Sequence, residues 1–592
     1  MDTSPFKKSD MIQTTGKSRL DDRLSPVILR KYMKILLTTL HAKYSHSSLA
    51  LPCLAACCRD ISGIEIVISE LTVNEPHEKL LRRIISEKAE LIAFSCYIWN
   101  IEETLKLVSD IKKISPDIVT VLGGPEVSFG VFDLMSANPA VDYVVKGEGE
   151  RVFKQLLNKL ANAESSEISN LFYRDKGDIT SGPLNSCYLE LDSIPSPFEA
   201  ELVDLSKPLI YYETSRGCPF SCAFCLSSVD RHVRSFSQKR IESDLQFLMH
   251  RKISQIKLVD RTFNYDSSRS DSIWKFILEN NRNSHFHFEI AADLLTDENL
   301  ALLKQVPPNR FRFEIGVQST SQDTLERVSR RADLGKIFEN VRRLRQETFI
   351  ELHLDLVAGL PGEDYAGLLD SLQQVAELRP HVIQIEPLKL LKGSAMRQIA
   401  DKEQYRYSDS PPYNILSTPD LSYDQVCRIE TIGRLLDLFH NQTGFETALK
   451  FMLAEMKFST LFDAMSAQVV DENLTGYNIR RTYELFARLV EKMLPPDKME
   501  ALSDALFFDY CSSELPLMGK LPSFVSARQK SCAWPGRGDL PEGPEFPVGS
   551  RVKCFRFSFC VDYRLEEWKK GETEMTFVYI SGAGMGLKVL VV

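Results

Sequence analysis

Short apolar runs alternate with amphipathic segments in the first part of this chain, and this alternation limits the folds that the chain can adopt. The expected strands lie at 34–40, 64–71, 91–97, 117–123 and 141–146. The expected helices lie at 47–60, 77–88, 101–114, 129–137 and 150–162. Because a helix separates each strand from the next, the pattern predicts an α/β domain with a parallel sheet covered on both faces. We assign this Rossmann-like domain to residues 33–162.

A second alternation of the same kind follows. Its expected strands lie at 209–214, 255–260, 285–292, 310–318, 350–358 and 382–390. Helices are expected between them, for example at 239–252, 267–281, 333–347 and 364–378. Six strand–helix units make about three quarters of an eight-stranded barrel. The sequence therefore predicts a partial (β/α)6, TIM-like barrel over residues 206–400.

The remaining segments have a different character. Residues 1–32 are polar and aperiodic, and we expect a disordered leader, with Met33 as an alternative start. Residues 163–205 are rich in Ser and Pro and predict a linker with a small strand hairpin. Helical periodicity over 421–510, followed by strand-like runs near the end, predicts a mainly helical C-terminal domain with terminal strands over 401–592.

Composition argues against several classes of protein. The net charge of -9 argues against a nucleic-acid binder that works by bulk positive charge. The 13 cysteines in 592 residues fit a reducing compartment better than a disulfide scaffold. We find neither a secretory signal nor an uninterrupted apolar run of membrane-spanning length, so we expect a cytoplasmic protein with no membrane segment.

Three cysteines, Cys218, Cys222 and Cys225, stand at C-x3-C-x2-C spacing directly after the first barrel strand. Three thiolates on a four-iron cluster leave one iron without a protein ligand, whereas electron-transfer ferredoxins use four cysteines. An open iron is a place for chemistry. The alternative is a structural zinc site, which needs a fourth ligand, and His232 is the nearest candidate.

This spacing, with the aromatic Phe224 before the last cysteine, resembles the radical S-adenosylmethionine (SAM) superfamily. The resemblance implies a 4Fe-4S cluster whose open iron binds the amino and carboxylate groups of SAM. It also implies that an electron from a reductant such as flavodoxin or ferredoxin cleaves SAM. The products are then methionine and a 5'-deoxyadenosyl radical that abstracts a hydrogen atom.

Polar residues also stand in the expected barrel strands, at Glu289, Gln318 and Asp355. Each needs a partner, which is either a core hydrogen bond or a polar ligand. Together with Arg330 and the Gly-Leu-Pro-Gly-Glu run at 359–363, they resemble the oxygen-independent coproporphyrinogen dehydrogenase branch of the superfamily.

That resemblance implies contacts to SAM. Glu289 and Arg330 would hold the methionine end, and Gln318 and Asp355 would bind the ribose hydroxyls. The backbone around Phe224 would contact the adenine.

Two of these assignments have alternatives. Arg331 can take the place of Arg330, because the sequence does not set the register. Many family members carry a Gly-Gly-Glu-like motif on the second strand, whereas this chain has Asp260 in the run Val259–Asn264. We expect Asp260 to bind the SAM amino group, unless this run faces the substrate.

The order of the two α/β domains resembles the cobalamin-binding subclass of the superfamily. The likeness is carried by residues 47–56 and by Ser95, Gly123 and Gly124, which follow the third and fourth expected strands. Glycine lets the backbone approach a bulky ligand closely. The resemblance implies that these residues flank the nucleotide tail of cobalamin.

The Asp-x-His-x-x-Gly signature of many cobalamin-binding proteins is missing. His41 and His46 stand at a different spacing, so the sequence names no axial histidine. The alternative is a nucleotide-binding-like domain that holds no cofactor.

The other cysteines carry less information. Cys53, Cys57 and Cys58 lie on an expected helix, where they are either core thiols or part of a second cluster, as in transfer-RNA methylthiotransferases. Four more lack a ligand spacing: Cys511, Cys532, Cys554 and Cys560.

The sequence thus predicts a cobalamin-dependent radical SAM enzyme that methylates an unactivated carbon of a small molecule, whose identity it does not indicate. A radical SAM reaction without net methylation, a transfer-RNA methylthiotransferase and a zinc-stabilised binding protein stay open as alternatives.

Overall fold

The computed structural model describes residues 32–162, 167–185, 188–469, 474, 476–517, 520–525, 550–565, 567–582 and 585–592. The chain divides into two compact units. The first contains residues up to His41 together with Ala50–Leu189, and the second contains Ala42–Leu49 together with Glu190–Val592. Apart from Tyr32, the expected leader lies outside the described residues, as does Cys532.

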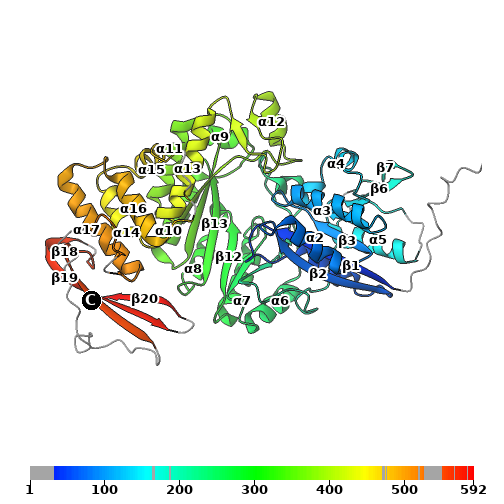
Figure 1. The fold of residues 1–592 in the computed structure, drawn as a ribbon, viewed down its shortest axis with the longest axis horizontal. Coiled ribbons are helices and arrows are strands. Elements are labelled where there is room, and N and C mark those ends of the chain that lie inside the picture. The colour runs from blue at the N-terminus through cyan, green and yellow to red at the C-terminus, as the bar shows by residue number, and fades with distance from the viewer. Residues whose placement is uncertain are drawn as a thin grey trace, which may run out of the picture. The chain divides into compact units, whose positions relative to one another are not determined.

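The first unit is built on a seven-stranded sheet with the order β2-β1-β3-β4-β5-β6-β7 (Figure 1). Its strands are β1 (Met33–His41), β2 (Ile64–Thr72), β3 (Leu91–Ser95), β4 (Val119–Gly123), β5 (Tyr143–Val145), β6 (Leu171–Asp175) and β7 (Asp178–Ser181). β1 to β5 pair in parallel, which confirms the expected parallel sheet. The hairpin β6–β7 adds two antiparallel strands to its edge, so the hairpin expected in the linker is part of the sheet.

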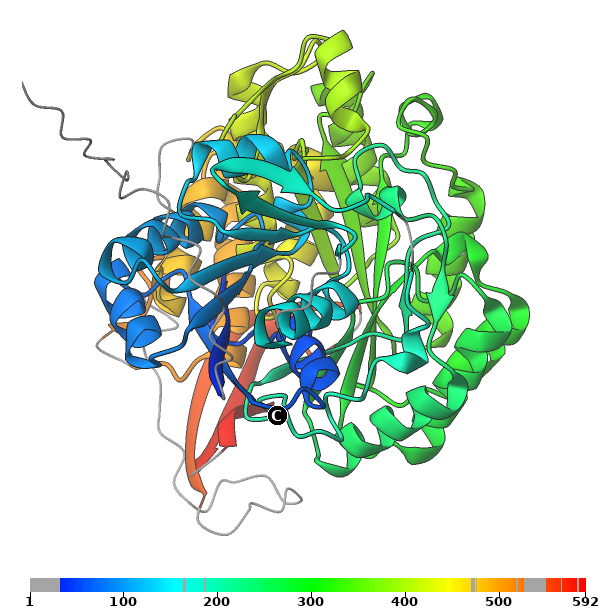
Figure 2. The same ribbon diagram turned by 90° about the vertical axis from the view of Figure 1, so that its right-hand side faces the viewer.

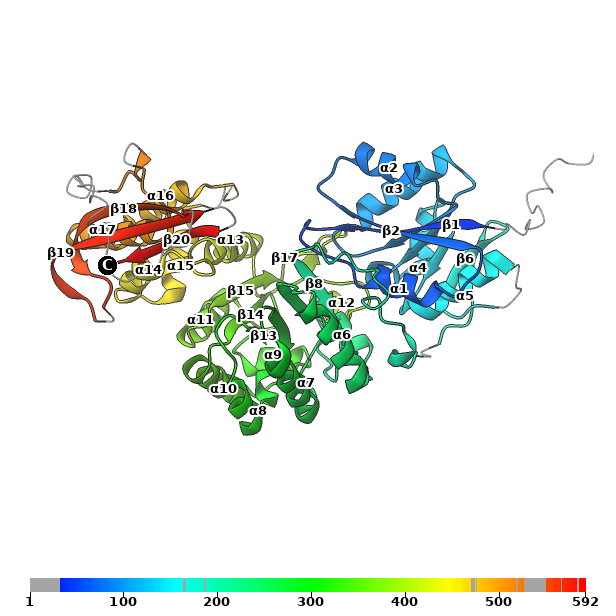
Figure 3. The ribbon, with the colours of Figure 1, turned by 90° about the horizontal axis from the view of Figure 1, so that it is seen from below.

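Helices cover both faces of this sheet. They are α1 (Ala50–Cys58), α2 (His77–Ser86), α3 (Ile101–Ile114), α4 (Val131–Ala137) and α5 (Gly149–Asn162). Figure 3 shows α2 and α3 on one side of the sheet and α1 and α5 on the other. All five residues of β3 are buried because the strand is central and covered on both faces.

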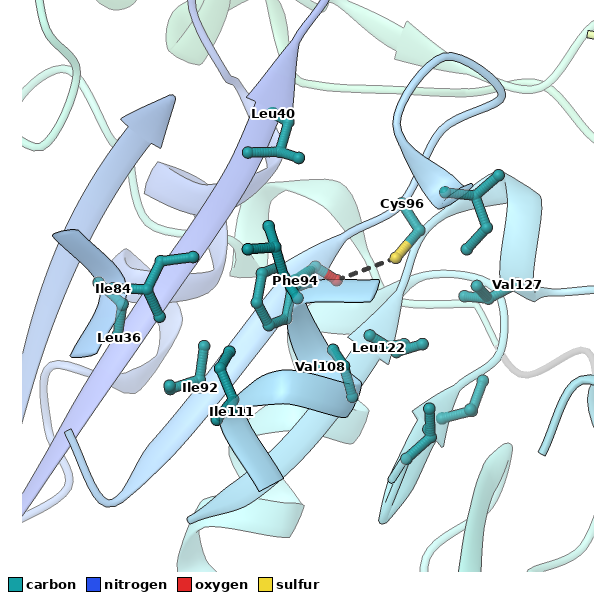
Figure 4. Close-up of a cluster of buried hydrophobic side chains, with 14 of the residues drawn as sticks. Leu36, Leu40, Ile84, Ile92, Phe94, Cys96, Val108, Ile111, Leu122 and Val127 are labelled. Carbon is teal, nitrogen blue, oxygen red and sulfur yellow. Dashed lines mark hydrogen bonds between the residues drawn. The ribbon is translucent and has the colours of Figure 1, made fainter. Parts of the chain in front are cut away.

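The core of the first unit lies between the sheet and the helices α2, α3 and α4 (Figure 4). Ile92 and Phe94 of β3 and Leu122 of β4 point into it and meet Val108 and Ile111 of α3. These side chains are almost fully buried. Close packing of this kind is sensitive to the loss of even a few methyl groups.

We expect Leu122→Ala to destabilise the first unit by about 2–5 kcal/mol, because it removes a fully buried side chain and leaves a cavity. Hydrogen exchange of peptides covering β3 and β4 measures the local free energy of opening. The matched control is Leu184→Ala, since Leu184 is 55% exposed in the same unit. Equal effects of the two substitutions would contradict this account of the core.

The second unit contains six parallel strands in the order β15-β14-β13-β12-β11-β8. They are β8 (Leu209–Tyr212), β11 (Gln255–Leu258), β12 (His285–Ile290), β13 (Phe311–Gln318), β14 (Glu351–Ala358) and β15 (Val382–Pro387). The helices are α6 (Gln238–His250), α7 (Ser267–Asn280), α8 (Asp297–Leu303), α9 (Gln322–Arg327), α10 (Leu334–Glu347), α11 (Tyr365–Glu377) and α12 (Met396–Lys402). In Figure 2 the green helices of this part lie along the outer side of the curved sheet. The partial barrel is therefore confirmed.

Side chains alternate along the barrel strands with the period of two that a β-strand imposes. On β12 and β13, Phe286, Phe288, Phe311 and Phe313 are fully buried. Phe288 and Phe313 contact the ring of Trp274 of α7, and Phe286 and Phe311 contact Phe288. The residues between them are only partly buried. Because Trp274 belongs to a covering helix, the phenylalanines face the helices and the polar residues face the inside of the barrel.

Both edges of this open sheet are covered by polar side chains from distant segments. At the β8 edge, Ser47 Oγ donates to Leu209 O at 3.1 Å and accepts from Tyr211 N at 3.4 Å. At the β15 edge, Asn441 accepts from Ile383 N and donates to Ile383 O, both at 2.9 Å. Ser47 thus caps a barrel strand, and the expected helix 47–60 begins only at Ala50. Each side chain thus satisfies two backbone groups of an edge strand, and the barrel stays open.

The C-terminal part is mainly helical with terminal strands, as expected. Its helices are α13 (Tyr423–Phe439), α14 (Glu446–Leu453), α15 (Phe458–Ser466), α16 (Ile479–Val490) and α17 (Pro496–Ser513). Its terminal strands β18 (Arg551–Asp562), β19 (Lys569–Gly582) and β20 (Met585–Val591) form an antiparallel sheet. Among the described residues, no helix combines the length and apolarity needed to cross a membrane.

Candidate functional site

The three cysteines lie in a loop closed by two short strands, β9 (Ser215–Arg216) and β10 (Arg234–Ser235). Gly217 has φ +92° next to β9, and a Cβ there would lie 2.5 Å from His232 O. Only glycine fits this position, because other residues disfavour the positive φ and their Cβ would collide with the His232 carbonyl. Cys218 N donates to Asp230 O at 3.0 Å, so the loop closes immediately around the first cysteine.

Each thiol has one polar neighbour. Cys218 Sγ lies 3.4 Å from Thr262 Oγ1, and Cys225 Sγ accepts from Ser227 N at 3.4 Å. Cys222 Sγ accepts from Arg330 Nη1 at 3.7 Å. Burial raises the pKa of the Cys222 thiol, and the charge of Arg330 opposes this effect. All three cysteines are free.

This donor set fits an iron–sulfur cluster. Soft thiolates are the ligands that such clusters use, and donors to the sulfurs are typical of their surroundings. Among the described residues, no group of three His, Cys, Asp or Glu side chains converges on a single metal ion.

Asp260 follows β11 and has no exposed surface. Its carboxylate accepts from Thr214 N at 2.9 Å and from the Thr214 and Ser215 hydroxyls, and it lies 3.6 Å from Arg269 Nη2. Thr214 and Ser215 lead into the cysteine loop. This environment favours a role in holding the loop over the expected contact with the SAM amino group.

Glu289 and Asp355 face the inside of the barrel, together with four residues that the sequence analysis did not select. These are Lys257, His287, Glu314 and His353. The distances are 3.4 Å from Lys257 Nζ to Glu289 Oε1, 2.9 Å from Lys257 Nζ to Glu314 Oε2, 2.9 Å from His287 Nε2 to Glu314 Oε2 and 3.1 Å from His353 Nε2 to Asp355 Oδ1. In the sequence, charged residues occupy alternate positions of neighbouring expected strands. This alternation was the signal that could have identified them.

The carboxylates of this group differ in pKa. Burial raises the pKa of Glu289 and of Asp355, and nearby cations only partly offset it. Burial acts in the same direction on Glu314, but the close contact with His287 and the charge and hydrogen bond of Lys257 bring its pKa well below the ordinary range. The site therefore holds one well-compensated carboxylate beside two that lack full compensation.

Gln318 ends β13 in a strained conformation, with φ +72°. The pairing between β13 and β14 shifts register between Gly316 and Gln318. A Cβ at Gly316 would lie 2.0 Å from Gln318 Nε2, so the side chain folds back over this glycine. Left-handed residues other than glycine gather at functional sites. In the sequence, the glycine two residues before Gln318 was the only local sign of this arrangement.

The structure distinguishes Arg330 from Arg331. Arg330 is half-buried, contacts Cys222 and donates through Nη2 to Gly316 O at 2.8 Å, whereas Arg331 is exposed. Arg330 thus links the cysteine loop to the strand that ends at Gln318. Both arginines line a cavity of about 640 Å³ with Ser221, Asp293, Gln322, Glu326, Ser329, Ala332 and Asp333.

The backbone around Phe224 is also fixed. Ala223 N donates to Val328 O, and Met396 N donates to Ala223 O, both at 2.8 Å. Phe224 itself is half-buried.

In the first unit, Ser95, Gly123 and Gly124 lie together where β3 and β4 end. Gly124 has φ +107°, and a Cβ there would lie 2.6 Å from Cys96 O. Cys96 N donates to Gly123 O at 2.7 Å. The two chain segments are thus in direct backbone contact, and the missing side chain at Gly124 allows this close approach at the C-terminal edge of the sheet.

Two further features lie at the ends of the strands of this sheet. Tyr97 and Trp99 stack with ring centroids 4.5 Å apart, and Trp99 is 45% exposed. His41 is buried and lies 2.7 Å from Glu70 Oε2. His46 belongs to the second unit, where its ring meets Tyr211.

Comparison with known proteins agrees with this geometry. The family model of the radical SAM superfamily matches residues 212–375, which include the cysteine loop and most of the barrel. The barrel is a radical SAM domain. The model of the B12 binding domain matches residues 35–157, and a model described as a protein of unknown function (DUF4080) matches residues 401–533. A radical SAM domain implies a 4Fe-4S cluster and SAM, and a B12-binding domain implies cobalamin.

Individual relatives are more distant. The cobalamin-dependent radical SAM methyltransferase TokK of Streptomyces tokunonensis is 24% identical over 365 residues, which are 58% of this chain and 53% of TokK. The anaerobic magnesium-protoporphyrin IX monomethyl ester cyclase of Rubrivivax gelatinosus is 21% identical over 395 residues, 64% of this chain and 69% of the cyclase. The chain spans about half the length of the first curated relatives that it matches.

A solved structure shows the same fold. The radical SAM methyltransferase TsrM from Kitasatospora setae, with cobalamin and a [4Fe-4S] cluster bound, has a TM-score of 0.53 and 17% identity. The match covers 64% of this chain and 82% of TsrM.

We expect Asp260→Asn to loosen the cysteine loop, because it leaves Arg269 without its buried counter-charge. Loss of one partner from a buried ion pair costs about 3 kcal/mol. Hydrogen exchange over residues 213–235 should rise, and the iron content per chain should fall. The control is Asp297→Asn, which removes an exposed ion pair with Arg343. Unchanged exchange and iron content in Asp260→Asn would refute the anchoring role.

We expect Gly124→Ala to weaken cobalamin binding by about tenfold or more, which corresponds to about 1.4 kcal/mol. The added Cβ collides with the Cys96 backbone and displaces the ends of β3 and β4. Gly130→Ala is the control, because Gly130 also has positive φ but no atom lies within 4 Å of its Cβ position. Titration of the purified protein with hydroxocobalamin measures the affinity. Equal losses in the two variants would assign the effect to backbone strain alone.

Proposed function

We propose that this chain is a cobalamin-dependent radical SAM methyltransferase that acts on an unactivated carbon of a small molecule. The observation that carries the proposal is the combination of a B12-binding domain with a radical SAM domain in one chain. The likeness to TokK, a methyltransferase with the same two cofactors in its name, supports this reading.

The bound cofactors would supply a substrate radical and a methyl group, and the chain's residues bind and position them. Cys218, Cys222 and Cys225 hold the cluster. Asp260 fixes the loop that carries them. The inner face of the barrel offers hydrogen-bonding groups for the polar parts of SAM.

Four side chains are the proposed SAM contacts: Glu289, Gln318, Arg330 and Asp355. The Gln318 side chain occupies the space where a side chain of residue 316 would begin. Arg330 donates to the carbonyl of the same glycine, Gly316. In the pairing of β13 with β14, Gly316 is opposite Asp355. Three of the four residues are therefore grouped around one glycine, which supports a common ligand.

A second candidate is a radical SAM reaction without net methylation. The match to the anaerobic cyclase, which covers 69% of that protein, favours it. Both candidates require the cluster and SAM. They differ in whether S-adenosylhomocysteine is formed, because only methyl transfer from SAM releases it.

The partners follow from the same chemistry. The substrate is a small molecule, and the electron comes from an external donor such as flavodoxin or ferredoxin. Such oxygen-sensitive chemistry suits the cytoplasm. Nucleic acid is not expected as a partner, given the net charge of -9. A role for residues 401–592 in substrate selection is part of the proposal.

We expect anaerobically purified, reconstituted full-length chain to bind about four irons and to convert SAM to 5'-deoxyadenosine when reduced. With added cobalamin, it should also release S-adenosylhomocysteine. Mass spectrometry of the SAM products measures both. Cys222→Ala should lose the iron and the 5'-deoxyadenosine, whereas Cys427→Ala, which changes a half-buried cysteine on α13, should keep them.

Other outcomes select the alternatives. 5'-Deoxyadenosine without S-adenosylhomocysteine in the presence of cobalamin would favour the non-methylating reaction. About eight irons per chain would favour a methylthiotransferase with two clusters. Zinc in place of iron would overturn the enzymatic reading.

A further inference from the structure

Arg330 is held in place by contacts on several sides. Its backbone N donates to Leu325 O at 2.8 Å, and the preceding Ser329 adopts a left-handed turn with φ +54°. Its Nη2 donates to Gly316 O at 2.8 Å, and its guanidinium lies 5.6 Å from the Phe220 ring centroid. A long side chain held in this way has little freedom to leave its position.

The same turn is bonded to the cysteine loop. Ala223 N donates to Val328 O at 2.8 Å, so the backbone that carries Arg330 and the backbone that carries Cys222 move together. Arg330 Nη1 then reaches Cys222 Sγ at 3.7 Å, within the range of a hydrogen bond to sulfur. The contact is part of the architecture rather than a chance approach of two mobile side chains.

A cation that donates to a cluster thiolate changes the energy of reduction. Reduction adds one negative charge to the cluster, and a nearby positive charge stabilises that state more than the oxidised one. Hydrogen bonds to the sulfurs and the surrounding charge are established controls of cluster potential. The effect is larger for a half-buried group than for one in open water.

We propose that Arg330 raises the reduction potential of the cluster by donating to Cys222 Sγ, and so acts as a positioning residue for electron transfer to SAM. This inference rests on the proposed function in one respect, that the three cysteines hold a cluster. It is independent of cobalamin, of methylation and of the substrate.

The test measures the midpoint potential of the cluster in the reconstituted full-length chain without SAM or cobalamin. The cluster is titrated anaerobically with a chemical reductant and followed by electron paramagnetic resonance. Arg330→Gln should favour the oxidised cluster by about tenfold, which corresponds to a potential about 59 mV lower for a one-electron couple. Arg330→Lys, which keeps the charge but not the fork of donors, should shift it in the same direction by less.

Arg331→Gln is the matched control. It removes a positive charge from the next residue, but Arg331 is exposed and screened by water and salt. The midpoint potential of the cluster in Arg331→Gln should therefore equal that of the cluster in the unchanged chain. A shift as large as that of Arg330→Gln would assign the effect to the general field and overturn the proposal.

Iron and sulfide analysis accompanies each titration. If Arg330→Gln keeps its cluster and its potential is unchanged, the proposal is wrong. If Arg330→Gln cannot hold a cluster, Arg330→Lys decides, because an unchanged potential in that variant overturns the proposal as well. Absence of a cluster from the unchanged chain would instead refute the proposed function itself.

Discussion

The cysteine loop can act as a cluster site only because hydrogen bonds fix it to three neighbouring parts of the barrel. Asp260 accepts from Thr214 N at the start of the loop, and Val328 and Met396 bond to the backbone of Ala223. Ordering a free loop of this length would cost about 1–2 kcal/mol per residue. These bonds offset that cost before any metal binds, so the thiols are presented by the fold.

The open barrel depends on a second constraint, the protection of its edges. Parallel strands at the ends of a sheet expose unpaired backbone groups, which favour association with other chains. Here Ser47 and Asn441 bond to the backbone of the two edge strands. The segment that carries Ser47 precedes the barrel by about 160 residues, and Asn441 follows it. The barrel therefore needs both flanking regions, which explains why Ala42–Leu49 groups with the second unit.

Much of the fold could be predicted from the sequence because strand and helix periods are local. The alternation of β12 and β13, and the glycine between β9 and the cysteines, are visible in single segments. The group around Glu314 was not predicted. Lys257, His287 and His353 come from three other strands, and only the register between strands brings them together. A single sequence contains no direct record of that register.

The same limitation applies to the surroundings of Asp260, whose contact with SAM stays a prediction. Asp260 is a polar residue after a barrel strand, so the sequence suggested a ligand contact. In the structure its carboxylate is buried and contacts Thr214, Ser215 and Arg269, which a single strand of sequence does not reveal. The hairpin β6–β7 is a similar case. Its strands were recognisable, whereas its pairing with β5 depends on an edge that the sequence does not display.

The charges inside the barrel show why a cation is the ligand that this surface suits. Glu314 is compensated by Lys257 and His287, and its pKa is low. Glu289 and Asp355 keep raised pKa values because burial outweighs the cations near them. A ligand that brings positive charge beside these two carboxylates would lower their pKa values. It would thereby offset the free energy that burial of the ionised carboxylates costs. SAM carries a sulfonium and an ammonium group, and both charges match this need. The uncompensated charge at Glu289 supports its proposed contact with the methionine end of SAM.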